Sequence, residues 1–373
     1  MTPISPTDAP MTTVEADTSV EDVDEADAVP RKVEPITYFG TEFDVHGLVR
    51  RFNQRAIIVP TFDPNAELPD GRAQGFQRGS VWRPGQRQRF IESLLLGFPV
   101  PGIFLVEQPG KKYLVLDGQQ RLTTLVAFYG DKFQLDSVDN KFSGLTYSTL
   151  NEDVQRALDD TFIQSIIIRT PTSVNEYESV YQIFERLNSG GTQLQPHEIR
   201  VALYGGFAVD TIRELNNDVN WRKIFGKKHE RLKDQELILR VLAFSAESRA
   251  YAAPLKTFLN TFLANHRDGE GVDLPDLAQR FAIATEILAR SLDPRPFRLG
   301  TQVNAAILES VFVGVMDRIA AGENYAAIPA SHWKANYEAL LANPNYLDAV
   351  SKATANEEPL ARRLQLAREQ FSG

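Results

Sequence analysis

The sequence contains no cysteine and lacks the features of a membrane-bound or secreted protein. Without cysteine, disulfides, thiolate metal sites, iron–sulfur clusters and cysteine nucleophiles are excluded. The most apolar uncharged segment, Ser93 to Val106, is broken by two glycines and two prolines, and it is shorter than the roughly 20 residues of a membrane span. The first 30 residues have neither the basic start nor the apolar stretch of a signal peptide. We therefore expect a cytoplasmic protein without a membrane segment.

Several motifs of nucleotide and DNA enzymes are also absent. The sequence has no G-x-x-x-x-G-K-[ST], no G-x-G-x-x-G and no G-x-S-x-G motif. Its five histidines are scattered, and none lies in the Asp-His pair that an HNH-type nuclease needs. These absences exclude a P-loop enzyme and argue against an HNH nuclease within the chain.

Acidic charge is concentrated at the N-terminus. Residues 1–36 contain nine acidic and two basic residues, a net charge of −7, so the other 337 residues account for only −2 of the total of −9. This segment has no periodic apolar pattern, and we predict that it is a disordered tail. Its role is either to keep the protein soluble or to compete, as an acidic mimic, with nucleic acid for a basic face.

The apolar patterns predict two parts with a boundary near residue 170. Residues 37–170 mix strand and helix patterns, whereas residues 171–373 are helical almost throughout. Strands are predicted at 57–59, 103–106, 113–116 and 163–168, and helices at 84–96, 119–129, 174–187, 196–204, 234–245, 254–264, 274–290, 303–320 and 359–371. The expected fold class is α+β, an α/β domain followed by an all-helical domain.

The strongest local signal is the sequence Asp-Gly-Gln-Gln-Arg at residues 117–121. A buried strand ends at Asp117, Gly118 allows a tight turn, and a helix begins at Gln119. The free backbone N–H groups and the positive dipole end of a helix that follows such a turn favour phosphate binding.

The side chains of this motif suggest roles in nucleotide chemistry. Asp117 is a candidate metal ligand, and Arg121 is a candidate for binding phosphate through both guanidinium nitrogens. Gln119 and Gln120 offer amides to a base or to water. The alternative is that Asp117 and Arg121 only form an ion pair that caps the helix.

Two further clusters are candidates for ligand contact. Gln77 and Arg78 lie in a stretch from Gly71 to Ile91 with five arginines and no acidic residue, which fits phosphate contact and base stacking or, alternatively, a solvated loop. Arg186 and Asn188 precede a Gly-Gly turn between two helices, which is either an ordinary helical joint or a part of the ligand site.

In their order along the chain, these motifs resemble the GmrSD N-terminal family, the ParB-like domain of modification-dependent restriction systems and other phage-defence proteins. The matching segments are Phe76–Trp82, Ile91–Ile103, Asp117–Thr124 and Phe184–Arg200, and the resemblance covers about residues 40 to 330. The intact Asp-Gly-Gln-Gln-Arg motif is its most specific part.

The resemblance implies a ParB/sulfiredoxin-like nucleotide-binding domain at residues 37–170, followed by a helical domain at 171–373. It implies binding of a nucleoside triphosphate of unknown base together with Mg²⁺ or another divalent cation, with Asp117 as the metal ligand. The implied catalytic residues are Asp117, Gln119, Gln120 and Arg121, and the implied nucleotide-binding residues are Gln77, Arg78, Gly118, Arg121, Arg186 and Asn188. Sulfiredoxin chemistry needs a cysteine and is excluded here.

We therefore expect an NTP-hydrolysing defence module that couples its nucleotide state to the recognition or cleavage of foreign DNA. Because family members that cut DNA carry an additional HNH domain, we expect the nuclease in a partner chain. The candidate DNA-binding residues are Arg83, Arg87, Lys227, Lys228 and Arg231, for which the alternative is a solvated surface. The alternative functions are a non-catalytic, nucleotide-gated DNA-binding or adaptor protein and a ParB-like DNA nuclease.

Overall fold

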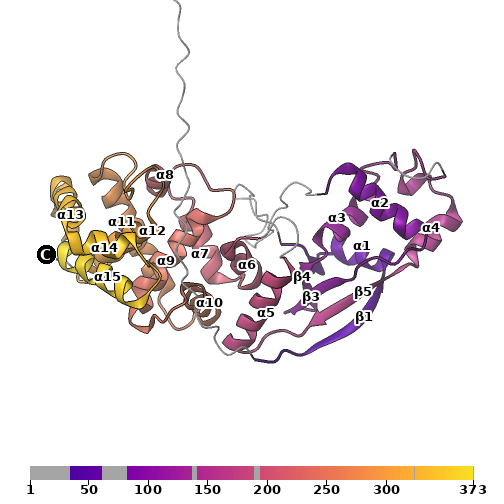
Figure 1. The fold of residues 1–373 in the computed structure, drawn as a ribbon, viewed down its shortest axis with the longest axis horizontal. Helices are drawn as coiled ribbons and strands as arrows, with labels where there is room; N and C mark the ends of the chain where they lie inside the picture. The colour runs from indigo at the N-terminus through magenta and orange to yellow at the C-terminus, as the bar shows by residue number, and fades with distance from the viewer. Residues whose placement is uncertain (1–33, 61–81, 137–140, 189–193, 323, 373) are drawn as a thin grey trace, which may run out of the picture.

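The computed structural model describes residues 34–60, 82–136, 141–188, 194–322 and 324–372 (Figure 1). The predicted acidic tail lies outside these residues except for its last three, and Gln77 and Arg78 lie outside them as well. The described residues form a five-stranded mixed sheet with helices and a long helical region, which confirms the α+β fold class. No helix in the described ranges is long and apolar enough to cross a membrane.

The sheet has the strand order β1-β5-β3-β4-β2. Its strands are β1 (Tyr38–Asp44), β2 (Ile57–Ile58), β3 (Ile103–Gln108), β4 (Lys112–Asp117) and β5 (Phe162–Ile168). β1 and β5 are antiparallel, as are β3 and β4, whereas β5 runs parallel to β3 and β4 parallel to β2. Asp117, the last residue of β4, lies opposite Phe104 near the start of β3.

Four helices cover one face of the sheet (Figure 1). They are α1 (Val45–Asn53), α2 (Pro84–Leu95), α3 (Gln119–Tyr129) and α4 (Glu152–Asp159). Their buried apolar side chains, such as Leu48, Ile91 and Leu122, pack with Val115 and Ile167 of the strands. Burial of this kind is the main favourable term in folding.

The region after the sheet is helical. Its helices are α5 (Val174–Leu187), α6 (Pro196–Leu203), α7 (Phe207–Leu215), α8 (Val219–Phe225), α9 (Lys233–Glu247), α10 (Leu255–Asn265), α11 (Leu274–Ser291), α12 (Ala305–Ala320), α13 (Ala330–Ala342), α14 (Pro344–Ser351) and α15 (Glu357–Phe371). Short 3₁₀ helices lie at Tyr147–Thr149, Ser248–Ala250 and Tyr325–Ala327. Every helix predicted from the sequence is present, and β1, α1, α4, α7, α8, α13 and α14 were not predicted.

One apolar core joins the sheet to the helical region. Val106, Leu116 and Ile168 of the strands belong to the same buried cluster as Val180 and Phe184 of α5. The sheet is therefore buried on both sides, by α1 to α4 on one face and by α5 on the other. Apolar side chains from both sides of residue 170 share this cluster.

A buried ion-pair triad ties three helices of the second part together. Arg240 of α9 donates from Nε to Glu309 of α12 at 2.8 Å, and Arg363 of α15 donates from Nε to the same carboxylate at 3.1 Å. All three side chains are almost fully inaccessible to solvent. Buried charges need such partners because removal from water is costly.

Glu34, at the start of the described chain, is held by α5. Its backbone N–H donates to Ser179 Oγ at 3.1 Å, and Asn175 Nδ2 donates to its carboxylate at 2.9 Å. The Ser179 hydroxyl also lies 2.8 Å from the Glu34 carbonyl oxygen. The acidic N-terminal segment is therefore attached to the body of the protein at this helix.

Candidate functional site

The Asp-Gly-Gln-Gln-Arg motif forms the predicted turn from strand to helix. Gly118 has φ +96°, a left-handed conformation that favours glycine. A Cβ atom at this position would lie 2.5 Å from Ile103 Cγ2, which is far closer than van der Waals contact. Both the backbone conformation and the space therefore require glycine between β4 and α3.

Asp117 and Arg121 form an ion pair across this turn. Arg121 Nη2 donates to Asp117 Oδ2 at 2.6 Å and to the Gly102 carbonyl oxygen at 2.9 Å. The Arg121 side chain is 14% exposed and that of Asp117 is 38% exposed. Among the described residues, Asp117 Oδ1 has no hydrogen-bond donor. The pair predicted as the alternative interpretation is thus present, and it leaves one carboxylate oxygen open to a ligand.

The N-terminus of α3 has no side-chain cap, a property that it shares with α2 but not with α1 or α5. Its N-cap residue is Gly118, which has no side chain to cap the helix. By contrast, α1 is capped by Asp44 and α5 by Ser173. An anionic ligand would supply the missing acceptor for the first N–H groups of α3 and would be stabilised by the helix dipole.

The two glutamines lie in different environments. Gln119 Nε2 is buried and has no hydrogen-bond acceptor among the described residues. Gln120 Oε1 accepts a hydrogen bond from the backbone N–H of Trp82 at 3.4 Å. Gln119 therefore has an unsatisfied amide at the turn, whereas Gln120 also connects α3 to the start of the next described segment.

Gln77 and Arg78 belong to residues 61–81, which the structure does not describe, and the described chain on either side of this segment includes β2 before it and Trp82 after it. β2 is the parallel neighbour of β4, which carries Asp117, and Trp82 contacts Gln120. Gln77 and Arg78 lie outside the described residues, so their assignment to the pocket stays a prediction.

The third cluster is partly brought to the turn. Asn188 Nδ2 donates to the Phe184 carbonyl oxygen at 2.7 Å and to that of Leu116 at 3.4 Å, which places Asn188 one residue from Asp117 along β4. Arg186 is exposed, and its Nη2 lies 3.5 Å from Gln182 Oε1 on the same helix. The structure thus brings Asn188, but not the guanidinium of Arg186, against the strand that ends in Asp117.

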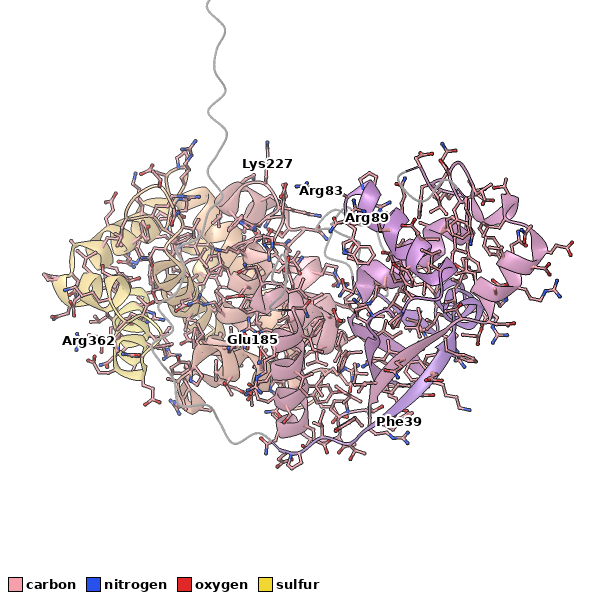
Figure 2. All side chains as sticks on the ribbon, turned by 45° about the vertical axis from the view of Figure 1, so that its right-hand side comes forward. Phe39, Arg83, Arg89, Glu185, Lys227 and Arg362 are labelled. Atoms are coloured by element: carbon pink, nitrogen blue, oxygen red, sulfur yellow. The ribbon has the colours of Figure 1, made fainter. Side chains whose placement is uncertain are left out.

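The predicted DNA-binding residues fall into two groups. Arg83 and Lys227 are exposed and lie on the same upper side of the molecule as Arg89 (Figure 2). Arg87 lies between Arg83 and Arg89 in the sequence, and Lys228 follows Lys227. The side chains of Arg87 and Lys228 are half-buried. We call Arg83, Arg87, Arg89, Lys227 and Lys228 the basic edge.

Arg231 does not belong to this surface, because its guanidinium is bound to Glu198. Its Nε and Nη2 donate to the two carboxylate oxygens of Glu198 at 2.9 and 3.0 Å, and Glu198 is fully buried. The Glu198 carboxylate also accepts a hydrogen bond from the backbone N–H of Gln195. The contact indicates a structural role for Arg231 at the start of α6.

The described residues contain no group of three or more histidine, aspartate or glutamate side chains that could hold a metal ion. A cation bound at Asp117 would therefore draw most of its ligands from water, from a substrate or from residues outside the described ranges. Such a site fits Mg²⁺, which keeps several waters and is bound through one or two carboxylates together with substrate phosphates. It does not fit a transition-metal centre held by protein ligands alone.

The sequence patterns did not identify two residues at the start of β3 that contact the turn between β4 and α3. Gly102 accepts from Arg121, and Ile103 lies against Gly118. Both belong to the segment Ile91–Ile103, which was noted as a motif without an assigned role. Their function depends on the antiparallel pairing of β3 with β4, which no local pattern specifies.

Comparison with known families identifies part of the chain. Residues 65–205 match the family model described as GmrSD restriction endonuclease, N-terminal domain. This stretch is similar to the GmrSD N-terminal domain. The match extends from the segment before α2 through α6 and includes all four motifs and the described part of the site. It is shorter than the resemblance noted from the motifs, and β1, α1 and β2 lie before it.

No curated protein and no solved structure matches the chain. The matched model describes a domain of restriction endonucleases, to which this stretch is similar. The match explains why the turn between β4 and α3, the segment Ile91–Ile103 and the joint between α5 and α6 occur in one chain. All three lie within the matched residues and meet around Asp117.

Proposed function

We propose that the turn at Asp117–Arg121 binds the phosphates of a nucleoside triphosphate and promotes its hydrolysis in a cytoplasmic defence module. The observation that carries the proposal is the position of an open carboxylate oxygen and a guanidinium at the N-terminus of a helix without a side-chain cap. This combination offers positive potential for phosphates and one ligand for a divalent cation.

The residues of the turn have separate roles in this proposal. Asp117 would hold the cation, while its Oδ2 orients Arg121. The N–H groups of α3 and the guanidinium of Arg121 bind phosphate oxygens, where they stabilise the charge that develops in the transition state. The buried amide of Gln119 is available to bind a phosphate or the attacking water. The cation, when bound, neutralises phosphate charge.

We further propose that nucleotide state is coupled to DNA through the basic edge. Arg83 and Lys227 come from different parts of the chain but lie on one side of the molecule (Figure 2). Such a surface neutralises the DNA backbone without reading its sequence. Cleavage is assigned to a partner nuclease, because the five histidines form no HNH arrangement in the sequence.

A first experiment measures phosphate release from each of the four ribonucleoside triphosphates with Mg²⁺, with and without DNA. Asp117→Asn keeps a hydrogen-bond acceptor for Arg121 but removes the negative charge. Its matched control is Asp153→Asn, since Asp153 is an exposed surface residue of α4. Loss of turnover in Asp117→Asn alone supports the proposal. Equal turnover in both variants overturns it.

A non-catalytic nucleotide switch is the second candidate function. It is favoured by the engagement of Arg121 with both Asp117 and Gly102, and by the finding that the described residues contain no group of three or more carboxylate or imidazole side chains that could hold a cation. This function predicts nucleotide binding that changes DNA affinity without release of phosphate. Calorimetric titration with a slowly hydrolysed triphosphate, followed by a phosphate assay on the same sample, distinguishes the two functions.

A further inference from the structure

Asn260 of α10 joins the two helices that flank the third motif. Its Oδ1 accepts from Arg200 Nε of α6 at 2.8 Å, and its Nδ2 donates to Glu178 Oε2 of α5 at 2.9 Å. Asn260 is 1% exposed, and Arg200 and Glu178 are buried as well. One amide therefore connects a cation and an anion on different helices.

The network continues from Glu178 along α5 toward the candidate site. Gln182 Nε2 lies 3.4 Å from Glu178 Oε1, and Gln182 Oε1 lies 3.5 Å from Arg186 Nη2. The next contact is that of Asn188, whose amide reaches the Leu116 carbonyl oxygen on β4. Within the described part of the chain, Asn188 is not bonded to this row of side chains, so α5 itself connects the contact of Glu178 with Asn260 to the contact of Asn188 with the strand of Asp117.

A second set of contacts fixes α10 against α5, α6 and α9. Lys256 Nζ lies 3.1 Å from Glu185 Oε1 on α5, where Glu185 is labelled in Figure 2. Arg200 Nη1 donates to Glu236 of α9 at 3.2 Å, and its Nη2 donates to the Lys256 carbonyl oxygen at 3.4 Å. Asn260 therefore lies in a rigid polar network.

Asparagine suits this position for a chemical reason. Its side-chain amide accepts at oxygen and donates at nitrogen, so it satisfies a guanidinium and a carboxylate at the same time. Aspartate would keep the acceptor for Arg200 but would face Glu178 with a second carboxylate. Leucine, of similar size, would leave both buried charges without this partner.

We infer that Asn260 is a positioning residue for the candidate nucleotide site. It fixes α5 relative to α6, and through the last turn of α5 it holds Asn188 against β4. Asn260 lies outside residues 65–205, the stretch that matches the GmrSD N-terminal model, so the helical region supplies part of the support for the site in that stretch. The inference rests on the proposed function only in that the supported site is the proposed nucleotide site.

The other titratable groups around this amide have defined charge states. Burial raises the pKa of the Tyr181 and Tyr204 hydroxyls, which therefore stay protonated. Burial, together with Arg200 and Arg213, lowers the pKa of His197 well below its usual value, so its ring is neutral. The charged groups facing the network are Glu178, Glu185, Arg200, Glu236 and Lys256.

The test replaces Asn260 by aspartate and follows pH. At about pH 8 the introduced carboxylate and that of Glu178 repel each other, and at about pH 5.5 the two can share a proton, which restores the contact. We expect Asn260→Asp to weaken binding of a slowly hydrolysed triphosphate by about tenfold or more at the higher pH and by less than about threefold at the lower pH. The control is Asn265→Asp, at an exposed position of the same helix. We expect its affinity for the triphosphate to change with pH no more than that of the wild type.

A double variant tests the chemistry directly. In Glu178→Gln/Asn260→Asp the positions of the amide and the carboxylate are exchanged, so the donor, the acceptor and the partner of Arg200 are all restored. We expect this variant to regain wild-type affinity at both pH values. If Asn260→Asp does not fold at the higher pH, recovery of folding and affinity in the double variant still supports the inference, and failure of the double variant overturns it.

Hydrogen exchange separates this inference from the proposed function. We expect amides in the last turn of α5 and the first turn of α6 to exchange faster in Asn260→Asp than in Asn265→Asp at the higher pH. Faster exchange together with a wild-type protein that binds no nucleotide would refute the proposed function and leave the positioning of α5 supported. Equal exchange and equal nucleotide affinity in the two variants would overturn the inference.

Discussion

Arg121 Nη2 lies 2.6 Å from Oδ2 of Asp117, the residue four positions before it and at the other side of a left-handed glycine. A cation in the first turn of a helix is unfavourable with respect to the helix dipole. Here the carboxylate of Asp117 and the Gly102 carbonyl oxygen compensate for it. In the proposed function, the guanidinium held in this way binds the incoming phosphate.

We predict that Arg121→Lys abolishes most nucleotide turnover. Lysine keeps the charge but cannot bind Asp117, Gly102 and a phosphate with one planar group, and loss of a transition-state donor costs about 10²-fold or more in kcat. Phosphate release under saturating nucleotide measures the effect. Arg156→Lys, at an exposed position of α4, serves as the control, and equal loss in both variants would contradict the assigned role.

We expect Gly118→Ala to lower the free energy of unfolding by more than the cost of placing alanine in a left-handed backbone conformation. The left-handed conformation alone costs a non-glycine residue about 1–2 kcal/mol, and the new Cβ would also meet Ile103. Gly110→Ala is the matched control, since Gly110 has φ +78° and open space around its Cβ position. Urea unfolding measures both variants. A difference of zero between them would show that the contact with Ile103 relaxes freely.

We expect Glu309→Gln to destabilise the helical region strongly. The change leaves Arg240 and Arg363 buried without their carboxylate partner, and breaking a buried pair typically costs about 3–5 kcal/mol. Glu358→Gln provides the control, because Glu358 pairs with Arg362 at the exposed surface, where pairs contribute about 0–1 kcal/mol. Chemical denaturation followed by circular dichroism compares them, and equal midpoints would argue against the triad as a stabilising element.

The basic edge makes a quantitative prediction about salt. If Lys227 and Lys228 each neutralise one DNA phosphate, Lys227→Ala/Lys228→Ala lowers the slope of log affinity against log salt by about 1.8. Lys352→Ala, at an exposed site in the loop after α14, should leave the slope unchanged. DNA binding measured by fluorescence anisotropy at several salt concentrations checks this. An unchanged slope in the double variant would remove these lysines from the DNA interface.

Arg231→Ala should behave differently from the lysine variant. Because Arg231 is the bidentate partner of the fully buried Glu198, its loss leaves a buried carboxylate with fewer donors, and we expect a destabilisation of about 1–3 kcal/mol. Thermal unfolding measures this loss. A normal melting temperature, together with a smaller slope of log DNA affinity against log salt concentration, would show instead that Arg231 contacts DNA.

The turn at Asp117 could be predicted because its signals are adjacent in sequence. An apolar strand, a glycine and a helical pattern follow one another within a few residues, and the helix begins at Gln119 as expected. The long helices of the second part were predicted for the same reason, since the repeats of apolar residues are local.

Elements that depend on distant partners were missed. β1 is an edge strand in which every side chain is exposed or half-buried, so its sequence lacks the run of buried apolar residues that marks the inner strands. α1 has nine residues and is stabilised by the Asp44 cap and by packing on the sheet. Gly102 and Asn260 act through contacts formed only after strands and helices assemble.

The apolar cluster shared by the sheet and α5 limits where the chain can be divided into fragments. A fragment ending near residue 170 would expose Val106, Leu116 and Ile168, which α5 otherwise covers. A fragment ending at residue 205 would lack Asn260 and leave Arg200 and Glu178 without their shared amide. The stretch that matches the GmrSD N-terminal model therefore depends on the helices that follow it, and a fusion protein built from this stretch would need those helices as well.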